Sequence, residues 1–383
     1  MHQFESEGFE AVLRLVAQRR SRGQRVLPLH AGEPDFPTPE PIVRAAHDAL
    51  DDGDTRYTPA VGKPELRSAL AAHVRQTRNV EVGPEHVVVA PGAKPVVYFA
   101  LLMLTEPGDD VLYLSPAYPI YRSVARFLGA NPVAVPMRIA DGTAGVDIDA
   151  LEAAVTPRTR VIVLNSPSNP TGAVLSAETL AQVAAIVERH DLAVISDEIY
   201  SEMVYGTTFA SIASVPGMLE RTVLVDGYSK TFAMTGWRLG YGVMPVELAE
   251  HFSKLMTNTL SCNVAFTQRG AIAALNMPSE VVQGMVAELR ARRDMFVDGL
   301  GGIPGVACAR PEGAFYAFAD FRELGVDSAS ATLALLRNHG VASYPGTAFG
   351  RDYDGFVRFS FGGRTDILRE ALYEIRAFAN ARG

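Results

Sequence analysis

The feature that most limits the fold of this sequence is a regular alternation of short apolar runs with longer amphipathic stretches. The runs have the length of buried strands, and stretches such as Ala177–Arg189 repeat apolar residues at helical spacing. This alternation predicts strand–helix–strand units, and therefore a mainly parallel sheet with helices on both faces. The runs that we expect to be strands are Val87–Ala90, Val111–Leu114, Val133–Val135, Val161–Asn165, Ala193–Asp197, Thr222–Asp226 and Gly240–Val243.

The last third of the chain has a different pattern. Residues 246–276 and 280–300 read as helices, and Ala314–Asp320 and Gly355–Phe361 read as strands of a separate antiparallel sheet. The helix expected over Phe9–Arg22 should pack with this C-terminal unit. With 383 residues, the chain is too long for one compact core. We therefore predict an α/β protein with a large domain at residues 46–285 and a smaller α/β domain formed by residues 1–45 and 286–383.

Composition argues against several functional classes. A net charge of −8 disfavours nucleic-acid binding as the main task. The two cysteines, Cys262 and Cys308, fit no zinc or redox spacing and indicate a reducing compartment, and the eight histidines form no metal-ligand motif. Residues 1–5 are polar and acidic, unlike a signal peptide, and no apolar stretch approaches the ~20 residues of a membrane span. We expect a cytoplasmic protein without a metal, a membrane or a nucleic-acid partner.

Reactive side chains follow the expected strands at the points where those strands end. Asn169, Asp197, Tyr200 and Lys230 all have this placement. Because the carboxyl ends of parallel strands meet at one edge of a sheet, one crevice could collect all four. Each residue alone has a commoner role, such as a solvated lysine, a helix-capping aspartate or a turn asparagine.

As a set, these groups suit pyridoxal phosphate. Lys230 would hold the cofactor as a Schiff base and carry a proton during the reaction. Asp197 would pair with the pyridinium nitrogen, and Tyr200 and Asn169 would donate to the phenolate oxygen.

A phosphate site is expected beside these residues. Pro91–Lys94 follows the strand Val87–Ala90 and opens an apolar helix, so the amides of Gly92 and Ala93, with Lys94 next to them, would face the phosphate. Ser229 could add a hydroxyl, and Arg238 could add a bidentate guanidinium. Tyr118 follows another strand and could stack on the pyridine ring, although an aromatic residue there is more often part of the core.

The substrate carboxylate needs an arginine of its own. Arg358 alternates with apolar residues in an expected strand, so it should be buried and should need an anionic partner. That partner is either the substrate or an internal Asp or Glu. Gly32 would let a backbone amide approach the same carboxylate. His30 precedes this glycine near the expected pocket, and the sequence assigns it no role.

Essentially from end to end, the sequence resembles the class I aminotransferases of fold type I. Within this class, it is similar to the aspartate aminotransferase family and its bacterial-type subgroup. The resemblance implies pyridoxal 5′-phosphate as cofactor, Lys230 as Schiff-base lysine, Asp197 as pyridinium partner and Arg358 as clamp for the α-carboxylate. It places Tyr57 on the cofactor phosphate of the neighbouring subunit, which implies a homodimer with shared active sites. The segments that carry the resemblance are Ala31–Phe36, Arg56–Pro59, Asn165–Gly172, Ser196–Tyr200, Ser229–Arg238, Pro345–Phe349 and Arg358.

Some positions depart from the family pattern or refine it. Gly227 stands where many relatives carry a serine, and Tyr118 stands where tryptophan is frequent. In the bacterial subgroup, a lysine at the position of Lys94 is implicated in binding a distal carboxylate. We therefore expect amino-group exchange between an L-amino acid, with acidic ones such as aspartate favoured, and a 2-oxo acid such as 2-oxoglutarate. The alternative is elimination, decarboxylation or cyclisation on the same scaffold, because the same residues serve those reactions.

Overall fold

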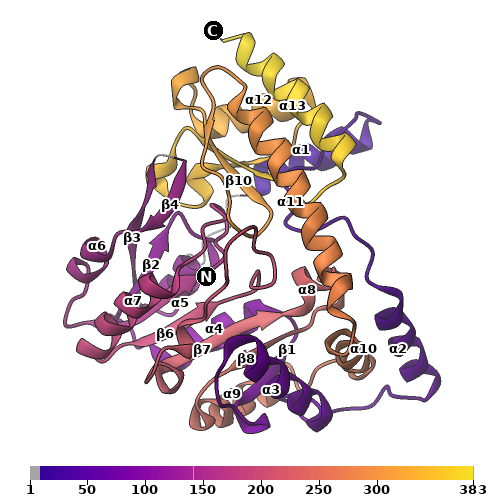
Figure 1. Cartoon of the computed structure of the whole chain (residues 1–383), viewed down its shortest axis with the longest axis vertical. Coiled ribbons are helices and arrows are strands. Elements are labelled where there is room, and N and C mark those ends of the chain that lie inside the picture. The colour runs from indigo at the N-terminus through magenta and orange to yellow at the C-terminus, as the bar shows by residue number, and fades with distance from the viewer. Residues whose placement is uncertain (1–8, 141, 383) are drawn as a thin grey trace.

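The computed structural model describes residues 9–140 and 142–382. Residues 1–5, interpreted above as unlike a signal peptide, and the first eight residues of the predicted small domain lie outside the described residues. The chain forms two parts, each built on its own sheet (Figure 1).

The larger part is built on an eight-stranded sheet with the order β1-β8-β7-β6-β5-β2-β3-β4. Neighbouring strands run parallel from β3 through β2, β5 and β6 to β7, which confirms the mainly parallel sheet predicted from the sequence. The edges are antiparallel, because β8 runs against both β7 and β1, and β4 runs against β3. The strands are β1 (Val87–Ala90), β2 (Asp110–Ser115), β3 (Asn131–Ala140), β4 (Thr143–Val146), β5 (Thr159–Asn165), β6 (Ala193–Asp197), β7 (Thr222–Gly227) and β8 (Gly240–Val243).

Helices cover both faces of this sheet. Along β2, Val111 and Tyr113 belong to the core on one face, whereas Leu112 and Leu114 belong to the core on the other. Burying a side chain of this size contributes about 1.5–3 kcal/mol, so both faces must be covered. The helices of this part are α2 (Glu40–Asp51), α3 (Pro64–Arg78), α4 (Ala93–Leu104), α5 (Ile120–Phe127), α6 (Ile148–Ala153), α7 (Ala177–Arg189), α8 (Tyr228–Thr231), α9 (Val246–Thr259) and α10 (Ala265–Leu275).

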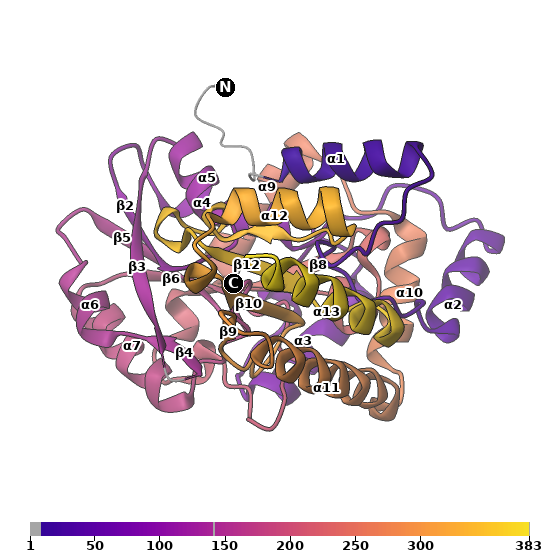
Figure 2. The ribbon, with the colours of Figure 1, turned by 90° about the horizontal axis from the view of Figure 1, so that it is seen from above.

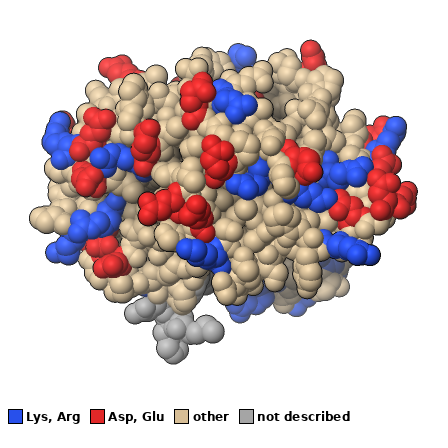
Figure 3. Space-filling view, turned by 90° about the horizontal axis from the view of Figure 1, so that it is seen from below, with Lys and Arg blue, Asp and Glu red and all other residues tan. Residues whose placement is uncertain are grey.

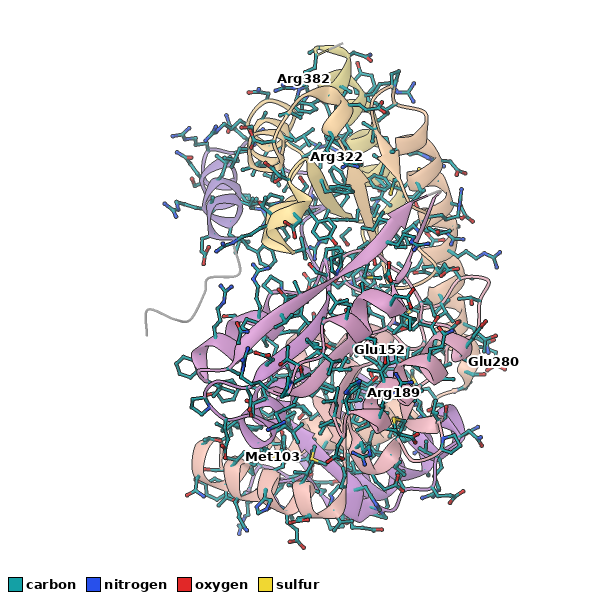
Figure 4. The ribbon with its side chains drawn as sticks, turned by 90° about the vertical axis from the view of Figure 1, so that its left-hand side faces the viewer. Met103, Glu152, Arg189, Glu280, Arg322 and Arg382 are labelled. Atoms are coloured by element: carbon teal, nitrogen blue, oxygen red, sulfur yellow. The ribbon has the colours of Figure 1, made fainter. Side chains whose placement is uncertain are left out.

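Local sequence explains the ends of these helices, as α7 illustrates. Ser176 caps α7 by accepting a hydrogen bond from the backbone N–H of Thr179 at 3.1 Å. Leu180, Val183 and Val187 then recur at helical spacing and are buried against the sheet. An ion pair between Arg189 and Glu152, both labelled in Figure 4, joins α7 to α6.

The smaller part is built on an antiparallel sheet with the order β11-β12-β10-β9. Helix α1 lies beside α12, as Figure 2 shows, and Leu27 forms a bridge to Val341, so the beginning and end of the chain pack together as predicted. Its elements are α1 (Glu10–Ser21), α11 (Ser279–Gly301), β9 (Ala307–Cys308), β10 (Tyr316–Asp320), α12 (Ser328–His339), β11 (Tyr344–Pro345), β12 (Phe356–Ser360) and α13 (Thr365–Asn380).

Both domain boundaries drawn from the sequence fall inside helices. The boundary between residues 45 and 46 lies within α2, which packs against α10 and contributes Ile42 to the core beside β1. The boundary between residues 285 and 286 lies within α11, a helix of 23 residues that runs from beside α10 to the smaller sheet (Figure 1).

The surface drawn in Figure 3 carries basic and acidic side chains side by side, without a broad patch of one sign among the described residues on that face. No described helix is both long enough and apolar enough to cross a membrane. Within residues 9–140 and 142–382, no three His, Cys, Asp or Glu side chains are grouped as metal ligands.

Candidate active site

A cavity of about 420 Å³ is lined by residues of both sheets and of α1. This volume falls within the roughly 300–1,000 Å³ of common small-molecule sites, so the cavity has the size of a ligand-binding site. It collects most residues that the sequence singled out: His30, Gly32, Ala93, Lys94, Tyr118, Asn169, Asp197, Tyr200, Ser229, Lys230, Arg238 and Arg358. Gly92 and Tyr57 do not line it.

Asp197 ends β6 directly opposite Asn165 of β5, in the crevice predicted from strand ends. Asp197 is 7% exposed, and its carboxylate accepts hydrogen bonds from Tyr121 Oη at 2.7 Å and from the backbone N–H of Ile199 at 3.3 Å. Burial raises the pKa of Asp197 to about 6, and these two hydrogen bonds act against that rise. Among the described residues, Asp197 forms no ion pair, so its carboxylate is available to pair with a cationic group of a ligand.

Tyr121 was missed by the sequence analysis. It lies in α5, three residues after Tyr118, and its side chain is 2% exposed. The available signal was the spacing of three residues between the two tyrosines, although Tyr118 precedes α5. The signal is weak, because an apolar stripe at this spacing is usually core packing.

Lys230 lies in α8, the short helix that follows β7. Its Nζ donates a hydrogen bond to the carbonyl of Gly32 at 2.5 Å. Burial lowers the pKa of Lys230 to about 8, Glu33 opposes this effect, and the positive charges of Arg358 and Arg238 reinforce it. An amine with this pKa is partly neutral near physiological pH, which is the form that attacks a carbonyl.

Gly32 lines the cavity and has a backbone contact that the sequence did not predict. Its backbone contacts Lys230, rather than only offering an amide to a carboxylate. A β-carbon at Gly32 would lie 3.0 Å from Tyr316 Oη, so the contact leaves little room for a side chain. Tyr316 Oη in turn lies 2.8 Å from Tyr200 Oη, and both tyrosines are buried. Tyr316 was not found from the sequence, since it alternates in β10 like any core aromatic.

The expected phosphate site has the shape of a backbone cradle. Gly92 caps α4 with φ of +96°, a conformation that favours glycine, and a β-carbon there would collide with the guanidinium of Arg238. Arg238 is exposed and donates from Nη1 to the carbonyl of Thr235 at 2.8 Å. Ser229 lies in the same cavity wall as the first residues of α4. The Gly92 N–H donates to the Ala90 carbonyl at 2.7 Å, so the predicted amide contact is left to Ala93 and the residues that follow it at the start of α4. N–H groups at a helix start beside a guanidinium are suited to a phosphate.

Arg358 points from β12 into the cavity and is 3% exposed. Its Nη1 donates to Asn169 Oδ1 at 3.1 Å and its Nη2 to the carbonyl of His30 at 2.7 Å, whereas its buried Nε has no acceptor. The guanidinium lies 4.4 Å from the ring centroid of Tyr316. No carboxylate of the described residues lies within ion-pair distance of Arg358. The internal Asp or Glu considered from the sequence is therefore not among them, and the site is suited to an anionic ligand.

Two predicted residues lie at the margins of this arrangement. Lys94 lines the cavity with its Nζ 5.3 Å from the ring centroid of Tyr118. Tyr57 is 90% exposed and does not line the cavity of its own chain.

The donor set fits pyridoxal phosphate. The amine of Lys230 is suited to its aldehyde, and the buried carboxylate of Asp197 is suited to its ring nitrogen. The start of α4 beside Arg238 is suited to its phosphate.

Comparison with known proteins agrees with this chemistry. The family described as Aminotransferase class I and II matches residues 24–375. The chain is 38% identical to the aspartate aminotransferase of Musicola paradisiaca over 368 residues, covering 95% of this chain and 92% of that protein. It is also 38% identical to the arginine–pyruvate transaminase of Pseudomonas aeruginosa, covering 93% and 91%. The solved aspartate aminotransferase of Thermus thermophilus with maleate superposes with a TM-score of 0.92 at 35% identity, covering 98% and 97%.

Proposed function

The chain belongs to the class I and II aminotransferases, and from that premise we propose which residues carry the reaction and which substrates they select. The protein is an enzyme, a pyridoxal-phosphate-dependent transaminase that exchanges an amino group between an amino acid and a 2-oxo acid. Elimination, decarboxylation or cyclisation is not favoured, because the relatives over nearly the whole chain are named as aminotransferases. When bound, pyridoxal phosphate supplies the electron-withdrawing ring that weakens bonds at the substrate Cα.

Asp197 would hold the ring nitrogen in its protonated form, with Tyr121 fixing the carboxylate from the other side. Asn169 Oδ1 accepts a hydrogen bond from Arg358, so Asn169 Nδ2 is left as a donor for the phenolate oxygen. Tyr200 would be a second donor to this oxygen. Ala93, Ser229 and Arg238 line the cavity and would bind the phosphate, with Lys94 beside them. Gly92 would leave room for the Arg238 guanidinium at the start of α4.

Lys230 would be the covalent anchor and the proton carrier. Its Nζ is held by the Gly32 carbonyl, and burial with two nearby arginines keeps its pKa at about 8. A base with this pKa can take the proton from the substrate Cα at physiological pH and return it.

The observation that carries the substrate proposal is a buried arginine without an acidic partner. Arg358 is held by Asn169 and by the His30 carbonyl, and its charge is not neutralised by any described carboxylate. We assign it to the α-carboxylate of the amino acid, because a fixed guanidinium binds a carboxylate through two parallel hydrogen bonds.

Lys94 would select acidic side chains. It lines the cavity beside Tyr118, and the Thermus relative was solved with maleate, a dicarboxylate. A charge-assisted hydrogen bond contributes roughly 1.5–3 kcal/mol, which corresponds to about tenfold to hundredfold in affinity. We propose aspartate or glutamate as donor and 2-oxoglutarate as acceptor.

The test compares substrate classes in one variant. Lys94→Met should lower kcat/KM for aspartate at least tenfold and leave kcat/KM for alanine and phenylalanine nearly unchanged. Equal losses for all three amino acids would make Lys94 a cofactor or structural residue, and the acidic specificity would be wrong.

We further propose a homodimer with shared active sites. Tyr57 is 90% exposed, and the Thr58 hydroxyl donates to the Asn263 carbonyl at 3.3 Å, which ties its loop to the segment carrying the exposed Leu260 and Val264. An exposed cluster of large apolar side chains of this kind favours an interface. Tyr57→Ala and Lys230→Ala chains should regain activity when reassembled together, because one hybrid site then has both residues intact. A fully active monomer in sedimentation would refute shared sites.

We also propose a large domain at residues 46–285, a smaller domain formed by the rest of the chain, and a cytoplasmic location. The location is supported by two free cysteines that form no disulfide with one another.

A further inference from the structure

His30 lines the active-site cavity, yet the roles assigned above use only its backbone carbonyl. The residue is 8% exposed, and its ring lies edge-on to Tyr344, with centroids 5.7 Å apart and an angle of 82° between the planes. The Arg358 guanidinium lies 5.1 Å from the centroid of the same tyrosine ring. The imidazole and the guanidinium therefore share one aromatic neighbour.

The backbone also brings these two residues together. The His30 carbonyl accepts a hydrogen bond from Arg358 Nη2 at 2.7 Å. The charge of Arg358 also lowers the pKa of the His30 imidazole, so a carboxylate bound by Arg358 would lie in the part of the cavity that this imidazole lines.

The ring nitrogens of His30 lack partners within the described chain. Nδ1 is fully buried without a hydrogen bond, and the ring forms no other side-chain hydrogen bond with residues 9–140 or 142–382. Because Nδ1 is closed off, only Nε2, which is not fully buried, is open to a ligand in the cavity.

The imidazole is neutral under physiological conditions. Burial, reinforced by the positive charges of Arg358 and Arg20, lowers the pKa of His30 to about 4. A neutral imidazole has one N–H donor and one lone pair. Positive neighbours favour a lone pair on the closed-off Nδ1, which leaves the hydrogen on Nε2, at the ring edge that can face the cavity.

We propose that His30 is a second binding residue for the α-carboxylate of the amino acid, donating a hydrogen bond from Nε2 while Arg358 supplies the charge. This inference rests on the proposed clamp role of Arg358. A neutral donor is suited to this place, because it adds a hydrogen bond without the repulsion that a second cation beside Arg358 would cause.

The test uses the holoenzyme and ligand pairs that differ only in the α-carboxylate, namely L-aspartate with β-alanine and L-phenylalanine with 2-phenylethylamine. Dissociation constants follow from the absorption change of the bound cofactor. His30→Phe keeps a ring beside Tyr344 but removes both nitrogens. It should weaken the α-carboxylate-bearing member of each pair about tenfold and leave the other member unchanged. His30→Gln, which keeps a neutral N–H donor, should recover part of the loss.

His73→Phe is the matched control, because it removes an imidazole from α3 that burial also holds at a pKa of about 4 but that does not line this cavity. It should change neither dissociation constant. Equal weakening of both members of a pair by His30→Phe, or no weakening, would overturn the inference. Nitrogen-15 spectra of the His30 ring should show the hydrogen on Nε2, and a hydrogen on Nδ1 would overturn it equally.

Arg358→Ala separates this inference from the proposed function. If Arg358→Ala leaves the affinity for L-amino acids unchanged, the clamp assignment is wrong. If Arg358→Ala weakens them but His30→Phe does not, only the role of His30 is wrong.

Discussion

The buried carboxylate of Asp197 should reduce the stability of the cofactor-free enzyme, and Asp197→Asn should relieve that cost. Burial raises the pKa of Asp197 from 3.8 to about 6. Each pH unit corresponds to about 1.36 kcal/mol, so the ionised carboxylate costs about 3 kcal/mol of folding free energy at neutral pH. Asparagine keeps the size and an acceptor for Tyr121 but carries no charge, so the variant should be more stable and nearly inactive.

The sign and pH window follow from proton binding. Between pH 3.8 and about 6, the folded protein holds more protons at residue 197 than the unfolded chain does. The stabilising contribution of the protonated acid is therefore complete below pH 3.8 and is lost as the pH rises through about 6. The advantage of Asp197→Asn over wild type should consequently grow with pH, by about 1.4 kcal/mol between about pH 5 and pH 7.5.

The assay is urea-induced unfolding of the two cofactor-free proteins across this pH range, compared at equal ionic strength. A stability difference that is independent of pH would refute the reasoning, because it would show that Asp197 titrates alike in the folded and unfolded states. Tyr121→Phe provides a second check. Removing the donor at 2.7 Å should raise the pKa of Asp197 further and move the whole transition to higher pH.

Three further predictions test the remaining groups. Borohydride reduction of the holoenzyme followed by peptide mapping should place the pyridoxyl label on Lys230, and a label on another lysine would contradict the assignment. Attachment of the cofactor to the cofactor-free enzyme should slow about tenfold for each pH unit below about 8, because only the neutral Nζ of Lys230 attacks the aldehyde and burial holds the pKa of Lys230 at about 8. Stopped-flow absorbance measures this rate, and a rate independent of pH from 6 to 8 would argue against a protonated lysine. Arg358→Ala should raise the dissociation constant of every L-amino acid at least tenfold, and Arg358→Lys should not restore it, since a point charge lacks the bidentate geometry; full recovery by lysine would show that charge alone suffices.

The sequence alone determined the elements and the site residues that sit at their ends. Apolar periodicity located β1, β6, β8 and α7 with the bounds that the structure shows, because burial on a sheet or helix face repeats at a fixed spacing along the chain. It also placed Asn169, Asp197 and Lys230 together, because the carboxyl ends of parallel strands share one edge.

Only the tertiary structure decided the contacts that join distant segments. Tyr121 and Asp197 are 76 residues apart in the sequence, and Tyr200 and Tyr316 are 116 apart. No local pattern distinguishes these tyrosines from core aromatics, since their hydrogen bonds depend on how elements pack. The sequence also did not show that β8 runs antiparallel to β7, because a short apolar run has the same pattern in parallel and antiparallel pairing.

The same limit applies to His30 and Gly32. The sequence showed a histidine before a glycine turn, but it could not show that the His30 carbonyl holds Arg358 or that the Gly32 carbonyl holds Lys230. Backbone carbonyls are present at every residue, so their partners are decided by where the folded chain brings charged side chains, and this site depends on two such contacts.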